Sequence, residues 1–376
     1  MLAIGRSAFA VASSLGLACV LLVLLGILTW LGTLAQVEHG LYEVQRKYFE
    51  SYVLVHEAGG VPVPLPGANL VLSVLAVNLV LGGFVRIRRT RDTWGVLIAH
   101  TGIVLLLAAG FVKHHASEDG RVTLFEGQSA SWFESDFRWE LVVSEAQGDG
   151  TTRENVVPFD SVARATAASP VVIEIPGATF SIEVHEAQAN ARVTVPRDDS
   201  GPRIAPVALD PEAGRNAPAV RVSIAALGGS SSSEAVLSGM RSAPFATTVG
   251  DRRFQFDLRR ERHALPFALT LTDFRKVDHP RSNMPRSFES DVVVDGGRSV
   301  TISMNEPLRE GGVVVYQASW GPQGAGETSR LFSTFAVVRN PADRLPIVAC
   351  AVIALGLVVH FGRKLARAMS VRRAAA

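Results

Sequence analysis

The chain has 376 residues, of which 48% are hydrophobic and 19% charged, and its formal net charge is +2. This near-neutral balance, with no patch of interleaved basic and aromatic residues, argues against a nucleic-acid-binding protein. The two cysteines, Cys19 and Cys350, both lie in apolar runs, which excludes a disulfide framework, a Cys-x-x-Cys redox site and a Cys-x-x-Cys-His haem attachment site.

The apolar residues are concentrated in long runs near the two ends of the chain, and the mean hydropathy of +0.24 is high for a water-soluble protein. A helix needs about 20 mostly apolar residues to cross the hydrocarbon core of a bilayer. We therefore expect membrane-spanning helices at residues 9–34, 68–85, 94–112 and 345–361. The first run could instead be a signal peptide, but its apolar stretch is too long and no small-x-small cleavage site follows it.

Basic residues flank these runs asymmetrically, and basic flanks of membrane spans stay in the cytoplasm. The loop after the second run carries Arg86, Arg88, Arg89 and Arg91, and the C-terminal tail carries five basic residues and no acidic one. The loop at 35–67 has two basic residues against four glutamates. We therefore expect a bacterial inner-membrane protein with both termini in the cytoplasm and a large periplasmic domain.

After the third run the chain changes to short segments of alternating apolar and polar residues, separated by turn signals such as Gly-Asp-Gly at 148–150. This pattern predicts an antiparallel β sandwich or a barrel-like domain. We expect strand segments at residues 121–125, 137–144, 171–175, 180–185, 220–225, 254–258, 267–274, 290–294, 298–303, 313–318 and 331–338.

The expected fold class is thus a membrane α-helical protein with four transmembrane helices and a large all-β domain between the third and fourth. Its parts are an N-terminal three-helix region (1–112) with an outer loop (35–67), a β-rich domain (113–344), and a C-terminal helix with a basic tail (345–376). A Pro/Asp/Gly-rich stretch at 197–218 and a Gly/Ser run at 228–233 are typical of loops. They could divide the β-rich domain into two halves near 197–233.

Three sequence patterns follow one another along the chain. They are Tyr-Phe-Glu-Ser at 48–51 with the Pro-rich stretch 61–67, Arg-Arg-Thr-Arg-Asp-Thr-Trp-Gly at 88–95 with Ala-His-Thr-Gly-Ile at 99–103, and Met-Asn-Glu-Pro-Leu-Arg at 304–309 with Val-Tyr-Gln-Ala-Ser-Trp at 315–320. These patterns, with three early spans, an outer domain and a final span, resemble the ResB family of the System II route of cytochrome c maturation. The resemblance covers nearly the whole chain.

The resemblance implies a function in haem transport and cytochrome c-type biogenesis. ResB-like proteins act with a ResC/CcsA-type membrane protein, which carries a Trp-rich haem-handling loop, and the pair presents haem b for attachment to apocytochrome c. The five tryptophans of this chain are scattered, at positions 30, 94, 132, 139 and 320, so it has no such loop. We therefore expect an accessory subunit of a haem lyase (cytochrome c synthase), and no acid–base pair or nucleophile indicates catalytic residues.

His100 is the candidate cofactor-binding residue. It lies about seven residues into the third expected span, roughly 10 Å from its cytoplasmic edge at about 1.5 Å per residue. An ionisable side chain at that depth normally faces a bundle interior or a cavity, and a neutral imidazole can bind haem iron as an axial ligand. The resemblance implies that a histidine at this position is one such ligand, the opposite ligand coming from the partner. Alternatively, His100 only hydrogen-bonds another helix, because Gly95, Ala99 and Gly102 allow close packing.

The other histidines give weaker signals. We expect His39, His56, His114 and His115 to be interfacial residues, His360 to extend towards the membrane surface, and His185, His263 and His279 to be solvated or structural. Three functions remain open: a haem-delivery subunit for cytochrome c assembly, a scaffold whose β domain holds the partner or apocytochrome c without binding haem, and an unrelated membrane protein with an outer sensing or transport domain. The absence of a Walker A motif and of a sizeable cytoplasmic segment weakens the third.

Overall fold

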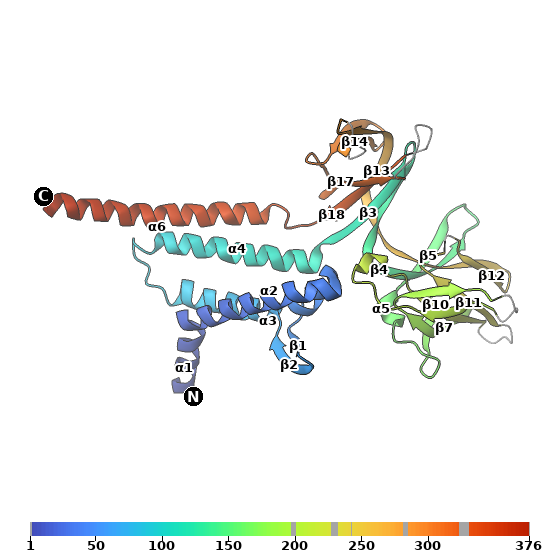
Figure 1. The fold of residues 1–376 in the computed structure, drawn as a ribbon, viewed down its shortest axis with the longest axis horizontal. Coiled ribbons are helices and arrows are strands. Elements are labelled where there is room, and N and C mark those ends of the chain that lie inside the picture. The colour runs from blue at the N-terminus through green and yellow to red at the C-terminus, as the bar shows by residue number, and fades with distance from the viewer. Residues whose placement is uncertain are drawn as a thin grey trace. The chain divides into compact units, whose positions relative to one another are not determined.

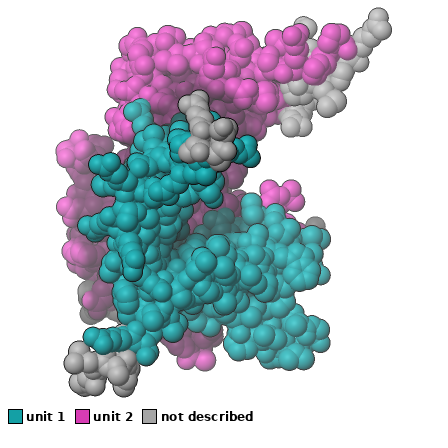
Figure 2. All heavy atoms as spheres, turned by 90° about the vertical axis from the view of Figure 1, so that its left-hand side faces the viewer, with its two compact units in different colours: residues 1–117, 340–376 teal, residues 118–339 magenta. Residues whose placement is uncertain are grey.

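The structure is a computed structural model that describes residues 2–196, 201–226, 232–241, 243–280, 285–322 and 331–375. The chain forms two compact units, coloured separately in Figure 2. The helical unit comprises Met1–Ser117 and Asn340–Ala376, and the β unit comprises Glu118–Arg339.

Four helices of the helical unit are long and apolar enough to cross a membrane, namely Leu15–Phe49, Ala68–Val85, Trp94–Ala116 and Leu345–Arg372. In chain order the unit consists of α1 (Leu2–Ala12), α2 (Leu15–Val44), the π-helical η1 (Gln45–Phe49), β1 (Val53–Ala58), β2 (Val61–Pro66), α3 (Ala68–Val80), the π-helical η2 (Leu81–Val85), α4 (Trp94–Ala116) and α6 (Leu345–Ala375) (Figure 1).

The first apolar run is divided between two helices, so the first long helix begins at Leu15 and not at residue 9. The cause is local, because the side chain of Ser14 accepts a hydrogen bond from the backbone N–H of Leu17 at 3.1 Å and caps α2. Across the break, Asn78 Nδ2 of α3 donates to the carbonyls of Ala12 (2.7 Å) and Ser14 (3.0 Å). α6 also continues beyond the expected end at residue 361.

The region expected as an outer loop is largely ordered. α2 continues to Val44 with a kink at Gly40, whose φ of 73° is a conformation that glycine adopts without steric cost. Beyond the kink, Val44 and Phe49 pack on Gly32, since an ideal Cβ there would lie 3.1 Å from the Phe49 ring. β1 and β2 then form an antiparallel hairpin, which turns at Gly59 and Gly60.

α4 and α6 pack closely because the residues between them are small. Gly95, Ala99 and Gly102 of α4 are buried. An ideal Cβ placed on Gly95 would lie 2.5 Å from the backbone nitrogen of His360. One placed on Gly356 would lie 2.4 Å from the backbone nitrogen of Ala99. This small-residue spacing lets two helix backbones approach within a membrane, as the sequence indicated.

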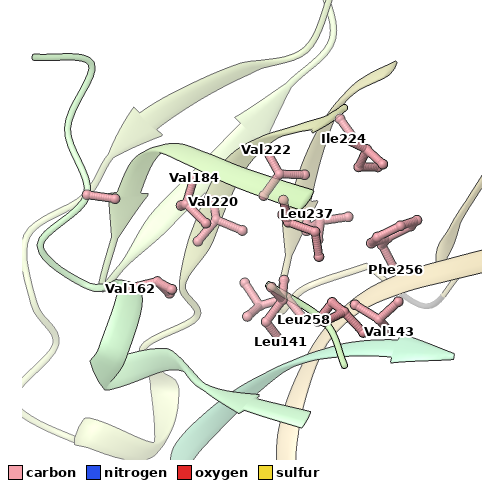
Figure 3. Packing of buried hydrophobic residues seen from close by; sticks show 14 of the residues in the cluster. Leu141, Val143, Val162, Val184, Val220, Val222, Ile224, Leu237, Phe256 and Leu258 are labelled. Carbon is pink, nitrogen blue, oxygen red and sulfur yellow. The ribbon is translucent and has the colours of Figure 1, made fainter. Parts of the chain in front are cut away.

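The β unit is organised around two long strands, β4 (Ser129–Ala146) and β13 (Arg252–Asp278). At one end, β4 pairs with β5 (Thr152–Pro158) and β13 pairs with β12 (Phe245–Val249). This end packs against a second sheet and α5 (Phe159–Val162). That sheet has the order β11 (Ser232–Ser238), β10 (Ala219–Ala226), β7 (Phe180–Gln188), β6 (Val171–Glu174). Figure 3 shows the first hydrophobic core, in which Leu141, Phe256 and Leu258 face Val184, Val222 and Leu237.

The other halves of β4 and β13 enclose a second hydrophobic core, which includes Phe133, Leu269 and Phe335. Here the sheet order is β15-β14-β13-β4-β3-β18-β17-β16. The remaining bounds are β3 (Glu118–Phe125), β14 (Pro285–Val294), β15 (Arg298–Ser303), β16 (Leu308–Glu310), β17 (Val313–Gly321) and β18 (Phe332–Arg339). Both cores therefore use the same two strands and are not separated at a single point of the chain.

All eleven predicted strand segments lie in or overlap observed strands, although 254–258 and 267–274 belong to the single strand β13. Of the two predicted loops, residues 197–200 and 228–231 lie outside the described residues. The rest of the first contains β9 (Arg203–Pro206), paired with β8 (Ala191–Thr194), and the short 3-10 helix η3 (Ala213–Arg215). The end of the second is also not a loop, since β11 begins at Ser232.

The β unit begins and ends on neighbouring strands. Glu118, the first residue of β3, and Arg339, the last residue of β18, are register partners. Their side chains form a salt bridge at 2.6 Å.

Candidate functional site

His100 lies in the second turn of α4, on a helix whose sequence is almost entirely apolar. Its side chain is half-buried, and its Nδ1 is fully buried without a hydrogen-bond partner in the described part of the chain. Nε2 also has no hydrogen-bond partner there, but it is not closed off in the same way. The two ring nitrogens are therefore distinct, because Nδ1 is covered by protein and Nε2 is not fully buried.

The cover over Nδ1 is the backbone of η2. An ideal Cβ placed on Gly83 would lie 2.4 Å from Nδ1 and 3.0 Å from Cε1 of His100, so any larger residue would collide with the ring. The neighbouring Phe84 approaches the same imidazole, with ring centroids 6.3 Å apart. A π-helical turn of this kind often marks a functional position in a helix.

The opposite side of η2 is fixed by the break between α1 and α2. An ideal Cβ on Gly82 would lie 2.9 Å from the carbonyl oxygen of Ser13. Arg86 also donates to this carbonyl at 3.4 Å. Gly82 thus contacts the break between α1 and α2, and Gly83 contacts the imidazole of His100. The ring therefore lies against a backbone segment that is itself packed on its other side.

Two other histidines have a buried ring nitrogen without a hydrogen bond, again counting only the described residues: His263 through Nε2 and His360 through Nδ1. His263 has a structural environment, because its ring stacks on Phe133 with centroids 5.2 Å apart and Glu118 approaches Nδ1 at 3.6 Å. His360 was expected to extend towards the membrane surface, but its Nδ1 is buried.

The remaining histidines are exposed or have a hydrogen-bonding partner of their own. His39, His114, His115 and His279 are exposed, whereas Nδ1 of His56 shares a hydrogen bond of 2.7 Å with the Tyr48 hydroxyl. Nε2 of His185 interacts with the Ser223 hydroxyl at 2.7 Å. Within the described ranges no group of three or more His, Cys, Asp or Glu side chains could hold a metal ion.

The arrangement fits a single-imidazole ligand better than a complete metal centre. His100 offers one ring nitrogen that is not fully buried, on an apolar helix, and an imidazole can donate the lone pair of such a nitrogen to iron. The alternative, a hydrogen bond from His100 to another helix, is not observed for the buried Nδ1 among the described residues. Sequence reasoning found His100 but not Gly83, whose signal was only a Gly-Gly pair in the second apolar run.

A comparison with family models matches residues 89–333 to the ResB-like family. The match covers more than half of the chain and includes His100, the whole of α4 and nearly all of the β unit. No curated protein matches the chain.

Proposed function

Because the chain belongs to the ResB-like family, which is associated with cytochrome c biogenesis, we propose that it is a membrane subunit that holds haem b through His100. In this proposal a ResC/CcsA-type partner would supply the other iron ligand, and the pair would support attachment of haem to apocytochrome c. The observation that carries the proposal is the difference between the ring nitrogens of His100, since Nδ1 is buried against η2 and Nε2 is not fully buried.

The proposed setting is the bacterial inner membrane, with both termini in the cytoplasm and the β unit in the periplasm. The four apolar helices support membrane association. Basic residues support the orientation, since they gather before α4 and in the tail of α6 and basic flanks remain cytoplasmic. Asp92 and Arg367 of these two segments form an ion pair at 3.0 Å, which places the basic ends of α4 and α6 side by side.

Nε2 is the proposed iron-binding nitrogen, because Gly83 leaves no room for a ligand at Nδ1. Haem, when bound, would supply an iron that accepts the lone pair of this nitrogen. This chain's own part is to orient one neutral imidazole and to keep its other nitrogen covered. The β unit would hold the partner or apocytochrome c.

The test uses the complex of this chain with its ResC/CcsA-type partner, purified from the membrane, and measures haem absorbance per protein. His100→Ala should lose most of the haem, and imidazole added to the buffer should restore part of it by filling the vacated position. His360→Ala is the matched control, because Nδ1 of His360 is also buried without a hydrogen bond among the described residues, and this variant should keep the haem.

Unchanged haem content in His100→Ala, with the complex still assembled, would reject the haem-ligand proposal. The chain would then act as a scaffold that binds its partner or apocytochrome c. Equal losses in His100→Ala and His360→Ala, with no recovery in imidazole, would also contradict a specific ligand.

A further inference from the structure

The β1–β2 hairpin is attached directly to the ends of two apolar helices. Only three residues join Phe49 to β1, and Gly67 alone joins β2 to α3. The junction is tight, because the N–H of Gly67 donates to the carbonyl of Tyr52 at 2.8 Å and Asn69 Nδ2 donates to the carbonyl of Glu50 at 2.7 Å. The hairpin therefore cannot move far from the first residue of α3.

The depth of that residue follows from the length of the helix. Ala68–Val85 has 18 residues, which at about 1.5 Å per residue is roughly 27 Å and close to the hydrocarbon thickness of a bilayer. A helix that crosses the membrane with this length begins at its boundary with water. Figure 1 shows the hairpin extending sideways from the helices, across the direction of α3. A hairpin in this position stays near the boundary along its whole length.

The two faces of the hairpin differ in what they contact. On one face Leu54 is 5% exposed in a cluster with Tyr48 and Val71, and His56 binds the Tyr48 hydroxyl. The opposite face carries Val53 and Val55, which are 67% and 50% exposed. The register places these valines beside Pro66 and Pro64, so that this face is an apolar surface without a partner in the described chain.

The outer edge of β2 lacks hydrogen-bond donors. The Gly67–Tyr52 hydrogen bond fixes the phase of the ladder, and hydrogen-bonded and non-bonded pairs alternate along antiparallel strands. The prolines at 62, 64 and 66 therefore occupy the alternate pairs, in which an N–H would point away from β1. Since proline has no N–H, the outer edge of β2 presents carbonyls alone and carries no unpaired donor at these three positions.

We propose that the Val/Pro face, formed by Val53, Val55, Pro62, Pro64 and Pro66, lies on the lipid of the outer leaflet, at the boundary between headgroups and acyl chains. A neighbouring residue suits this level, because Tyr52 is 57% exposed and tyrosine side chains collect at membrane interfaces. Glu57, the one carboxylate on this face, lies near the tip beside Gly59. The hairpin should therefore be deepest at its root.

Prolines on a strand edge also prevent pairing with other strands in water, so the edge alone does not decide between lipid and water. The exposed valines decide for lipid, since an apolar face fixed at the end of a membrane span has acyl chains as its nearest apolar partner. This inference rests on the membrane placement in the proposed function, but not on haem binding.

The test places a fluorescent label at single cysteines in the full-length chain, with Cys19 and Cys350 replaced by alanine. The labelled variants are Val55→Cys on the Val/Pro face, Leu22→Cys on the exposed side of α2, and Asp149→Cys in an exposed turn of the β unit. Each is reconstituted into phosphatidylcholine/phosphatidylglycerol vesicles. Quenching by lipids brominated near the carbonyl end of the acyl chain is compared with quenching by aqueous iodide.

The label at 55 should be quenched strongly by brominated lipid and weakly by iodide, with the reverse result at 149. Iodide quenching at 55 as strong as at 149 would overturn the inference in favour of a water-exposed hairpin. Protection from both quenchers that requires the co-expressed partner would overturn it in favour of a protein contact. If the label at 22 also escapes lipid quenching, the membrane placement itself fails together with this inference.

Discussion

The backbone of Gly83 lies directly on the imidazole of His100, with space for a hydrogen atom but not for a methyl group. An ideal Cβ on Gly83 would be 2.4 Å from Nδ1. Gly83→Ala should therefore push the ring away from η2 at an overpacking cost of about 1–3 kcal/mol. We expect haem per complex to fall and the absorption bands of the remaining haem to shift.

The matched control for Gly83→Ala is Gly110→Ala in α4, because nothing lies within 4 Å of the added methyl group there. This control should keep the wild-type spectrum. An unchanged spectrum in Gly83→Ala would show that the position of the His100 ring does not depend on η2.

The contact between α4 and α6 should be equally intolerant of bulk. Gly356→Ile places a branched side chain where even a Cβ would lie 2.4 Å from the backbone nitrogen of Ala99, so the helices must separate. We expect a loss of thermal stability of the detergent-solubilised chain, monitored by circular dichroism. Gly362→Ile on the same helix has open space around it and should melt close to the wild type. Equal melting of the two variants would contradict the close helix contact.

Arg259 holds a buried carboxylate of the β unit. It contacts Glu140 at 2.9 Å and Glu154 at 2.6 Å, and the side chains of Arg259 and Glu140 are only 14% and 5% exposed. Burial raises the pKa of Glu140 in spite of the arginine. Arg259→Ala leaves this carboxylate without its cation and should cost about 3–5 kcal/mol, measured by urea unfolding.

The control for Arg259→Ala is Arg298→Ala, which breaks an exposed ion pair with Glu310 and should change stability by about 1 kcal/mol or less. The Arg259→Ala variant should also recover stability in mild acid. The raised pKa of Glu140 means that its folded form takes up a proton more readily, and the neutral carboxyl no longer needs the cation. Similar losses of unfolding free energy in Arg259→Ala and Arg298→Ala would contradict the burial of the Arg259–Glu140 pair.

Asp291 should make the β unit sensitive to acid. Hydrogen bonds from Arg275 and from the Thr301 hydroxyl lower the pKa of Asp291 below its ordinary value of 3.8. A lowered carboxyl pKa contributes stability that is present above the unfolded value and is lost as the pH falls through the folded value. Asp291→Asn should therefore flatten the decline in stability below about pH 4. Identical acid unfolding profiles of this variant and the wild type would refute the assignment.

The repeating features of the fold were readable from the sequence, and features that depend on a single contact were not. The apolar runs placed α3 and α4 well, because composition and length alone decide a span. The predicted start of the first long helix was wrong because Ser13 and Ser14 do not interrupt the apolar run, whereas the hydroxyl of Ser14 caps the N-terminus of α2 and so begins a new helix there. The length of β13 was hidden by Pro266, since irregular pairing with β4 around this residue lets the strand continue.

The candidate site shows the same limit. His100 stood out because an ionisable residue in an apolar run is rare. Its partner Gly83 lies 17 positions earlier, and no pattern within one helix shows that the two will touch. The hairpin was missed for a related reason, because alternate prolines lower strand propensity. The residues between the prolines nevertheless pair with β1, and this pairing needs no N–H from the prolines. Whether His100 binds iron stays a prediction.

The pairing of Glu118 with Arg339 brings the entry and exit of the β unit to one place. A segment whose two ends meet can be removed and replaced by a short turn without stretching the chain on either side. The two helices that carry these ends, α4 and α6, already pack on each other through glycines. The helical unit, including His100, is therefore separable by genetic excision, and haem retention by the shortened chain would show which half of the molecule contains the binding activity.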